Sequence, residues 1–71
     1  MEFKLKAEFV ELDNVLKVQA LAGNAAEAKE LIKAGLVRIN GEVETRVRRK
    51  LRSGDIVEFK ETHINIAGGL H

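Results

Sequence analysis

The chain has 71 residues, of which 45% are hydrophobic and 32% are charged. This length suffices for one domain with a thin core, and it is too short for a second domain or a deep enzyme cleft. The sequence has no cysteine and only two histidines, which excludes disulfides and cysteine zinc sites and leaves few metal ligands. We therefore expect neither a bound metal nor a cofactor.

The positions of the charged side chains also indicate the cellular compartment of the protein. The stretch where a signal peptide would have its apolar core is interrupted by Glu2, Lys4, Lys6 and Glu8. The longest run without Asp, Glu, Lys or Arg is residues 62–71, about half of the roughly 20 apolar residues that a membrane helix needs. We expect a soluble, cytoplasmic protein without a membrane partner.

The first predicted elements are a strand and two helices. Apolar and charged residues alternate over residues 2–8, the period of a half-buried strand. Over residues 12–20 apolar residues recur at intervals of three and four, which predicts a helix ended by Gly23. Asn24 can cap a second helix over residues 25–34 by accepting a hydrogen bond from a free amide of its first turn.

The second predicted helix is asymmetric in charge, and Gly35 closes it. At 100° per residue its apolar face consists of Ala25, Ala28, Leu31 and Ile32. Lys29 and Lys33 lie along one flank of that face. This flank is a candidate binding surface.

A hairpin follows the two helices. Asn40-Gly41 is a strong turn signal, because both residues accept positive φ, and it predicts a return strand through Val43. Residues 56–59 and 63–66 indicate two further strands. We expect a single domain over residues 1–71, with its core at about 8–66 and a frayed tail at 67–71.

The densest charge cluster lies between the hairpin and the strand at 56–59. Residues 45–52 hold five basic side chains in eight positions, with Val47 and Leu51 as apolar anchors, and we expect an irregular loop. The guanidinium group of arginine matches phosphate oxygens in two-point contacts. We expect Arg48 and Arg49 both to face solvent.

A run of charge is more often a solvated face than a binding site. Here the net charge of residues 29–52 is +5, from eight basic and three acidic side chains, while residues 1–28 and 53–71 each carry −2. The lysine flank of the helix and the basic segment can converge on one surface, which favours nucleic-acid binding over solvation. The absence of Tyr and Trp argues against single-strand stacking platforms and favours recognition of backbone and shape.

The residues also carry a family resemblance. The sequence is similar to the S-four type (αL) RNA-binding domain through Leu12-Asp13, Leu16, Gly23, Ala28-Lys29, Ile32, Gly35, Val37-Arg38-Ile39-Asn40-Gly41 and Gly54-Asp55. Within that superfamily it is similar to the short YbcJ-like proteins through Gly41-Glu42-Val43-Glu44-Thr45-Arg46 followed by Arg48-Arg49-Lys50-Leu51. The resemblance implies an α+β fold, with two N-terminal helices packed on a small antiparallel sheet. It also implies that the second helix and the hairpin region hold RNA. Asn24-Ala25 stand where many members have Ser-Arg.

We accordingly predict a monomeric RNA-binding protein for structured RNA, such as ribosomal or tRNA-like RNA, in a ribosome or another ribonucleoprotein. The predicted contact residues are Lys29, Lys33, Arg38, Arg46, Arg48, Arg49 and Lys50.

No enzyme is predicted, because each candidate catalytic residue has an ordinary explanation. Ser53 lies in a turn, His63 in a strand without an evident acidic partner, and Glu42 and Glu44 have the spacing of a solvent-facing strand edge.

The sequence leaves one alternative open. It also resembles small ubiquitin-like sulfur carriers, which are activated through a terminal Gly-Gly, in Val37-Arg38-Ile39-Asn40-Gly41-Glu42, Gly54-Asp55-Ile56 and Ile66-Ala67-Gly68-Gly69. Leu70 and His71 follow it here, and in such carriers the first hairpin precedes the helix.

Overall fold

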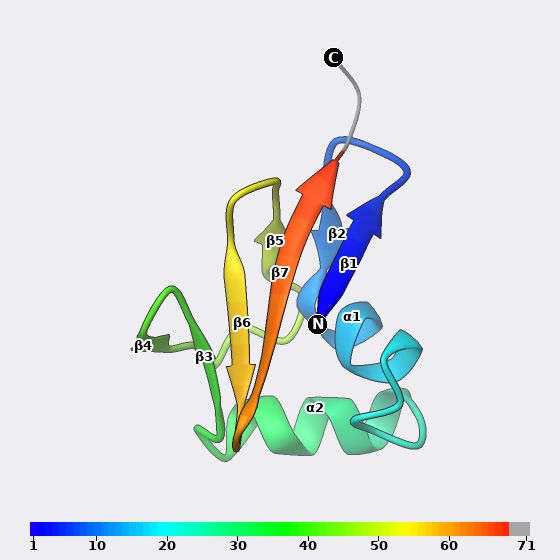
Figure 1. Cartoon of the computed structure of the whole chain (residues 1–71). Coiled ribbons are helices and arrows are strands. Elements are labelled where there is room, and N and C mark those ends of the chain that lie inside the picture. Colours follow the sequence, from blue (N-terminus) through cyan, green and yellow to red (C-terminus); the bar gives the residue numbers. More distant parts are fainter. Residues whose placement is uncertain (69–71) are drawn as a thin grey trace.

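A five-stranded sheet organises the fold in the computed structural model, which describes residues 1–68 (Figure 1). In sheet order the strands are β1 (Glu2–Leu5), β7 (Thr62–Gly68), β6 (Ile56–Phe59), β3 (Val37–Ile39) and β4 (Glu42–Val43). A separate two-stranded sheet pairs β2 (Val10–Glu11) with β5 (Lys50–Leu51). The helices are α1 (Leu12–Val18) and α2 (Ala25–Lys33). The predicted α+β fold with two helices is confirmed.

The sheet is mixed, which corrects the prediction of an antiparallel sheet. β1 pairs with β7 in parallel, so that Lys4 lies opposite Ala67 and Leu5 opposite Gly68. Ala67 and Gly68 therefore belong to a strand and do not fray, while residues 69–71 of the predicted tail lie outside the described residues. Alternation in a sequence indicates a strand but carries no information about a partner some 60 residues away.

α1 begins where the sequence predicted and ends earlier. Ala20 takes a left-handed backbone, with φ of 59°, and turns the chain before Gly23 is reached. The main-chain amides of Leu21 and Ala22 both donate to the carbonyl of Leu16. The prediction that Gly23 ends the helix is wrong. Apolar residues continue at three-residue spacing as far as Leu21, although the backbone has already turned at Ala20.

α2 has the predicted start and end. The side chain of Asn24 accepts a hydrogen bond from the amide of Glu27 at 2.8 Å, and Gly35 follows the helix with φ of 78°. Ala28 and Ile32 are buried, whereas Ala25 is exposed and does not belong to the apolar face predicted for it. No helix within residues 1–68 is long and apolar enough to span a membrane.

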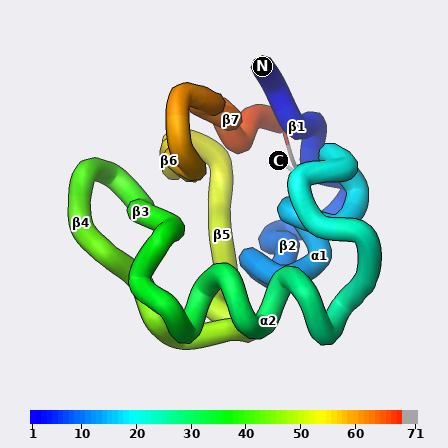
Figure 2. Tube along the Cα trace, turned by 90° about the horizontal axis from the view of Figure 1, so that it is seen from below, coloured from blue at the N-terminus to red at the C-terminus, as the bar shows by residue number. Residues whose placement is uncertain are grey.

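Both helices lie on one side of the sheet (Figure 2). The side chains that are completely or almost completely buried between these layers are Leu12, Leu16, Ile32, Leu51, Ile64, Val15, Val37 and Val57. Leu51 lies in the basic segment, so that segment is anchored in the core, as predicted.

The β3–β4 hairpin turns at Asn40 and Gly41, with φ of 53° and 86°, as predicted. The side chain of Asn40 also bridges to a neighbouring turn. Its Nδ2 donates to Oδ1 of Asp55 at 3.0 Å, and its Oδ1 accepts from the amide of Ile56 at 2.9 Å. This bridge fixes the hairpin against the start of β6.

Candidate nucleic-acid interface

Residues 45–52, here called the basic loop, are tied to the amino end of α1. Glu11 at the N-cap makes no side-chain cap. Instead the first amides of the helix donate to loop carbonyls, from Leu12 to Arg49 at 2.9 Å and from Asp13 to Val47 at 3.1 Å. The loop thus satisfies helix amides that would otherwise lack a partner. It is irregular as far as Arg49, as predicted, and then continues as β5.

A buried carboxylate lies directly before the basic loop in the sequence. Glu44 is only 7% exposed. It accepts hydrogen bonds from Nε and Nη2 of Arg46, at 3.1 and 2.9 Å, and from Nη1 of Arg49 at 2.7 Å. The prediction that Glu44 faces solvent is wrong, because β4 ends at Val43 and the strand pattern does not continue to the next residue.

The two arginines also shift the titration of this carboxyl group. The side-chain hydrogen bond from Arg46 is the main cause that lowers the pKa of Glu44 from 4.5 to about 2, with a further contribution from Arg49, and desolvation opposes the change. Glu44 is therefore ionised at neutral pH and holds both arginines by charge-assisted hydrogen bonds.

The loop arginines differ in exposure. The side chains of Arg46 and Arg48 are 72% and 77% exposed, while that of Arg49 is 29% exposed. The expectation that Arg49 faces solvent is thus wrong. Arg48 is paired with Glu11, its Nε lying 2.9 Å from Oε2.

Lys50 and Arg52 surround an aromatic ring that the sequence analysis did not single out. The Nζ atom of Lys50 lies 4.8 Å from the centroid of Phe9, and Cζ of Arg52 lies 6.0 Å from it. Phe9 lies in the link between β1 and β2. The pairing of β2 with β5 in the structure is what brings this residue to the basic loop, and no local signal in the sequence indicates that pairing.

The amino-terminal half of α2 meets the basic loop. Lys29 and Arg48 line one surface hollow, together with Asp13, Ala25, Ala26 and Val47. Arg48 also lines a second hollow with Arg46, Arg49 and Lys50. In Figure 2 the chain that leads from β4 to β5 passes beside α2. Five of the seven predicted contact residues therefore share one continuous surface.

The other two predicted residues lie elsewhere. Lys33 is exposed in the last turn of α2 and lines neither hollow. Arg38 points away from the core on β3 and lines a separate hollow with Glu58 and Lys60. The structure does not bring Arg38 together with the basic loop.

The surface stays positive after its ion pairs are counted. The basic loop carries five positive side chains, and the carboxylates of Glu11 and Glu44 offset two of them, leaving +3. Lys29 and Asp13, which line the same hollow, cancel each other. These groups leave a net charge of +3 around the two hollows.

A family model for the S4 domain matches residues 3–67. The chain belongs to the S4 domain family. The match includes most of β1 and β7, so it extends beyond the domain core predicted at about residues 8–66. The two helices of this S4 domain precede its hairpin, so the sulfur-carrier alternative has no support. The second glycine of its Gly-Gly pair, Gly69, lies outside the described residues.

Similar proteins are known from two bacteria. YbcJ of Escherichia coli (strain K12) is 41% identical over 54 residues, which are 76% of this chain and 77% of YbcJ. YbcJ of Shigella flexneri matches with the same identity and coverage. The solution structure of YbcJ from E. coli has a TM-score of 0.71 and 36% identity, covering 93% of this chain and 85% of that one. That structure shows an αL motif involved in RNA-binding.

Proposed function

We propose that this S4 domain binds structured RNA through the basic loop and the adjoining turn of α2. The observation that carries the proposal is the surface hollow that Lys29 and Arg48 line together. Arg48 also lines the hollow of Arg46, Arg49 and Lys50, so it connects the two hollows. The similarity to YbcJ, whose αL motif is involved in RNA-binding, supports it.

The hydrogen bonds of the loop leave donors for phosphate. Arg46 directs Nε and Nη2 to Glu44, and its Nη1 group remains available because a guanidinium has five N–H donors. Arg48 likewise directs Nε and Nη2 to Glu11 and keeps Nη1. The acidic partners thus hold the guanidinium groups in place without consuming all of their donors.

A loop held in this way loses little conformational freedom on binding. Its main chain is fixed by two hydrogen bonds to α1 and by the β2–β5 pairing. Three of its four arginines, Arg46, Arg48 and Arg49, are held by Glu44 and Glu11. Such preorganisation favours affinity, because less side-chain and loop entropy is lost when the partner binds.

The partner in this proposal is folded RNA of the ribosomal or tRNA-like kind, within a ribosome or another ribonucleoprotein of the cytoplasm. Lys33 extends the surface along α2. Arg38 contacts only an RNA large enough to continue around β3. The protein acts as a monomer and binds without catalysis.

The direct test is charge reversal at the shared hollow. Lys29→Glu and Arg48→Glu should each weaken binding to a transfer RNA and to a ribosomal RNA hairpin by about tenfold or more, measured by fluorescence anisotropy at one salt concentration. Lys17→Glu is the matched control, because it makes the same charge change at an exposed lysine of α1 that lines neither hollow. Equal effects of all three changes, or none, would contradict the proposed surface.

A further inference from the structure

Phe9 is an exposed aromatic residue beside two cations. It is 37% exposed, although the next residue, Val10, packs against the core. Lys50 and Arg52 approach its ring at 4.8 and 6.0 Å. These three residues are called the Phe9 corner below. An aromatic face flanked by positive charge matches the two parts of a nucleotide, a base that stacks and a phosphate that pairs with cations.

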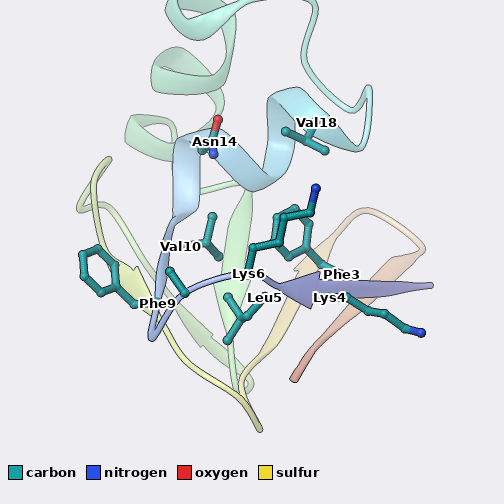
Figure 3. Close-up of a pocket in the computed structure, with 9 residues that line it drawn as sticks. Phe3, Lys4, Leu5, Lys6, Phe9, Val10, Asn14 and Val18 are labelled. Atoms are coloured by element: carbon teal, nitrogen blue, oxygen red, sulfur yellow. The ribbon is translucent and has the colours of Figure 1, made fainter. Parts of the chain in front are cut away.

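A hollow of about 460 Å³ adjoins the ring of Phe9. Its lining is mostly apolar and includes Phe3, Leu5, Val10 and Val18. Figure 3 shows Lys6 beside Phe3 at one end of this hollow, while Phe9 projects at the other end. The hollow therefore offers an apolar wall with a cation at its edge, which suits a flat, weakly polar group attached to a phosphate chain.

The Phe9 corner continues the proposed RNA surface. Lys50 lines the hollow of Arg46, Arg48 and Arg49, and the same ammonium group lies over Phe9. An RNA strand that contacts these arginines thus reaches Phe9 while it stays beside positively charged side chains. This continuity selects RNA over an apolar peptide as the occupant.

We propose that the Phe9 corner binds one unpaired nucleotide of the RNA, with its base stacked on Phe9 toward the apolar hollow and its phosphate at Lys50 and Arg52. The inference rests on the proposed function and adds to it the kind of RNA feature that is recognised, a stem next to an unpaired nucleotide. A single phenylalanine suffices for one base, so the lack of Tyr and Trp does not oppose it.

The test uses two RNAs with the same stem, one blunt and one with a single 2-aminopurine overhang. The wild-type protein should bind the overhang RNA at least about fivefold more tightly, the lower end of the effect of one base–aromatic stack, and should quench the 2-aminopurine fluorescence. Phe9→Leu, which keeps an apolar side chain, should abolish the preference and leave the affinity for the blunt stem unchanged. Phe9→Tyr should retain the preference.

The outcomes separate this inference from the proposed function. Equal wild-type affinity for the two RNAs, or an equal loss for both in Phe9→Leu, overturns the nucleotide site while RNA binding stands. Binding of neither RNA overturns the proposed function and this inference with it. Self-association without RNA that Phe9→Leu removes, measured by analytical ultracentrifugation, would assign the corner to a second copy of the chain and overturn the nucleotide site.

Discussion

Oε1 of Glu44 lies 2.9 Å from Nη2 of Arg46 and 2.7 Å from Nη1 of Arg49, so one carboxylate oxygen bridges two guanidinium groups. The most basic segment of the chain is thus built around a buried acid. Without that acid the two guanidinium groups would repel each other and would lack a fixed position. Glu44 therefore determines where the positive charge of the loop lies.

Glu44→Gln should lower the free energy of unfolding at pH 7 by about 1–3 kcal/mol, because it leaves both guanidinium groups without their anionic partner. The folded-state pKa of Glu44 is lowered from 4.5 to about 2, so its stabilisation is complete above pH 4.5 and is lost as the pH falls through 2. Urea unfolding of the wild type and of Glu44→Gln should be measured from pH 7 to pH 1.5. The difference between their unfolding free energies should disappear as the pH falls from 4.5 through 2.

Glu42→Gln is the matched control for this experiment, since Glu42 is an exposed glutamate of the same hairpin. Its stability should follow that of the wild type at every pH. A constant difference between wild type and Glu44→Gln across the pH range would show that the ion pairs do not stabilise the fold.

Charge reversal should separate Arg48 from Arg49. Arg49→Glu places a second carboxylate against buried Glu44, and we expect a loss of about 3–5 kcal/mol in unfolding free energy. Arg48→Glu disrupts only an exposed pair with Glu11, so stability should change by about 1 kcal/mol or less while RNA affinity falls. Thermal unfolding of both variants can be followed by circular dichroism. Equal melting temperatures of Arg48→Glu and Arg49→Glu would contradict this prediction.

The turn residue Asn40 has two roles that substitution can separate. Asn40→Gly keeps a residue suited to φ of 53° but removes the bonds to Asp55 and Ile56, at a cost of about 1 kcal/mol. Asn40→Ala adds the strain of a left-handed backbone, about 1–2 kcal/mol more. Chemical denaturation should rank wild type above Gly above Ala, and Ala at least as stable as Gly would argue against strain at this turn.

Phosphate binding should appear as a salt dependence. With about five phosphates neutralised, the slope of log K against log salt should lie near −3.5 to −4.5. Lys29→Ala and Lys33→Ala should each reduce its magnitude by about one unit and weaken all RNA sequences alike. Titrations at several salt concentrations on two unrelated stems would measure this. If Lys29→Ala reduces the magnitude of the slope and Lys33→Ala leaves it unchanged, the interface is confined to the hollow that Lys29 and Arg48 line.

The predictions that held depend on chemistry within a few residues. Asn24 caps α2 through an amide three positions later, and Asn40-Gly41 turns a hairpin whose strands adjoin it. At such sites the side chain or the backbone preference of one residue determines the conformation. The prediction that Lys29 lies beside the basic loop also used elements that are close in the sequence, since only the β3–β4 hairpin separates α2 from the loop.

The features that were missed depend on distant partners. Leu5 pairs with Gly68 across the sheet, and Phe9 reaches Lys50 only because β2 pairs with β5. Glu44 occupies an alternating position whose sequence context is that of an exposed strand, and only the folded loop shows that two arginines compensate its burial. Reasoning from residue spacing does not reach such contacts.

The parallel pairing of β1 with β7 also has a consequence for how the chain folds during its synthesis. β1 is made before the other elements described here, yet its only neighbour in the sheet within residues 1–68 is β7, the last of these elements to be made. Until residues 62–68 emerge, β6 also lacks one partner, and Ile64 and Ile66 are missing from the core. A nascent chain therefore exposes the apolar side of β1 until β7 has been made. We expect the domain to form in one late step, when the final strand inserts between the two that wait for it.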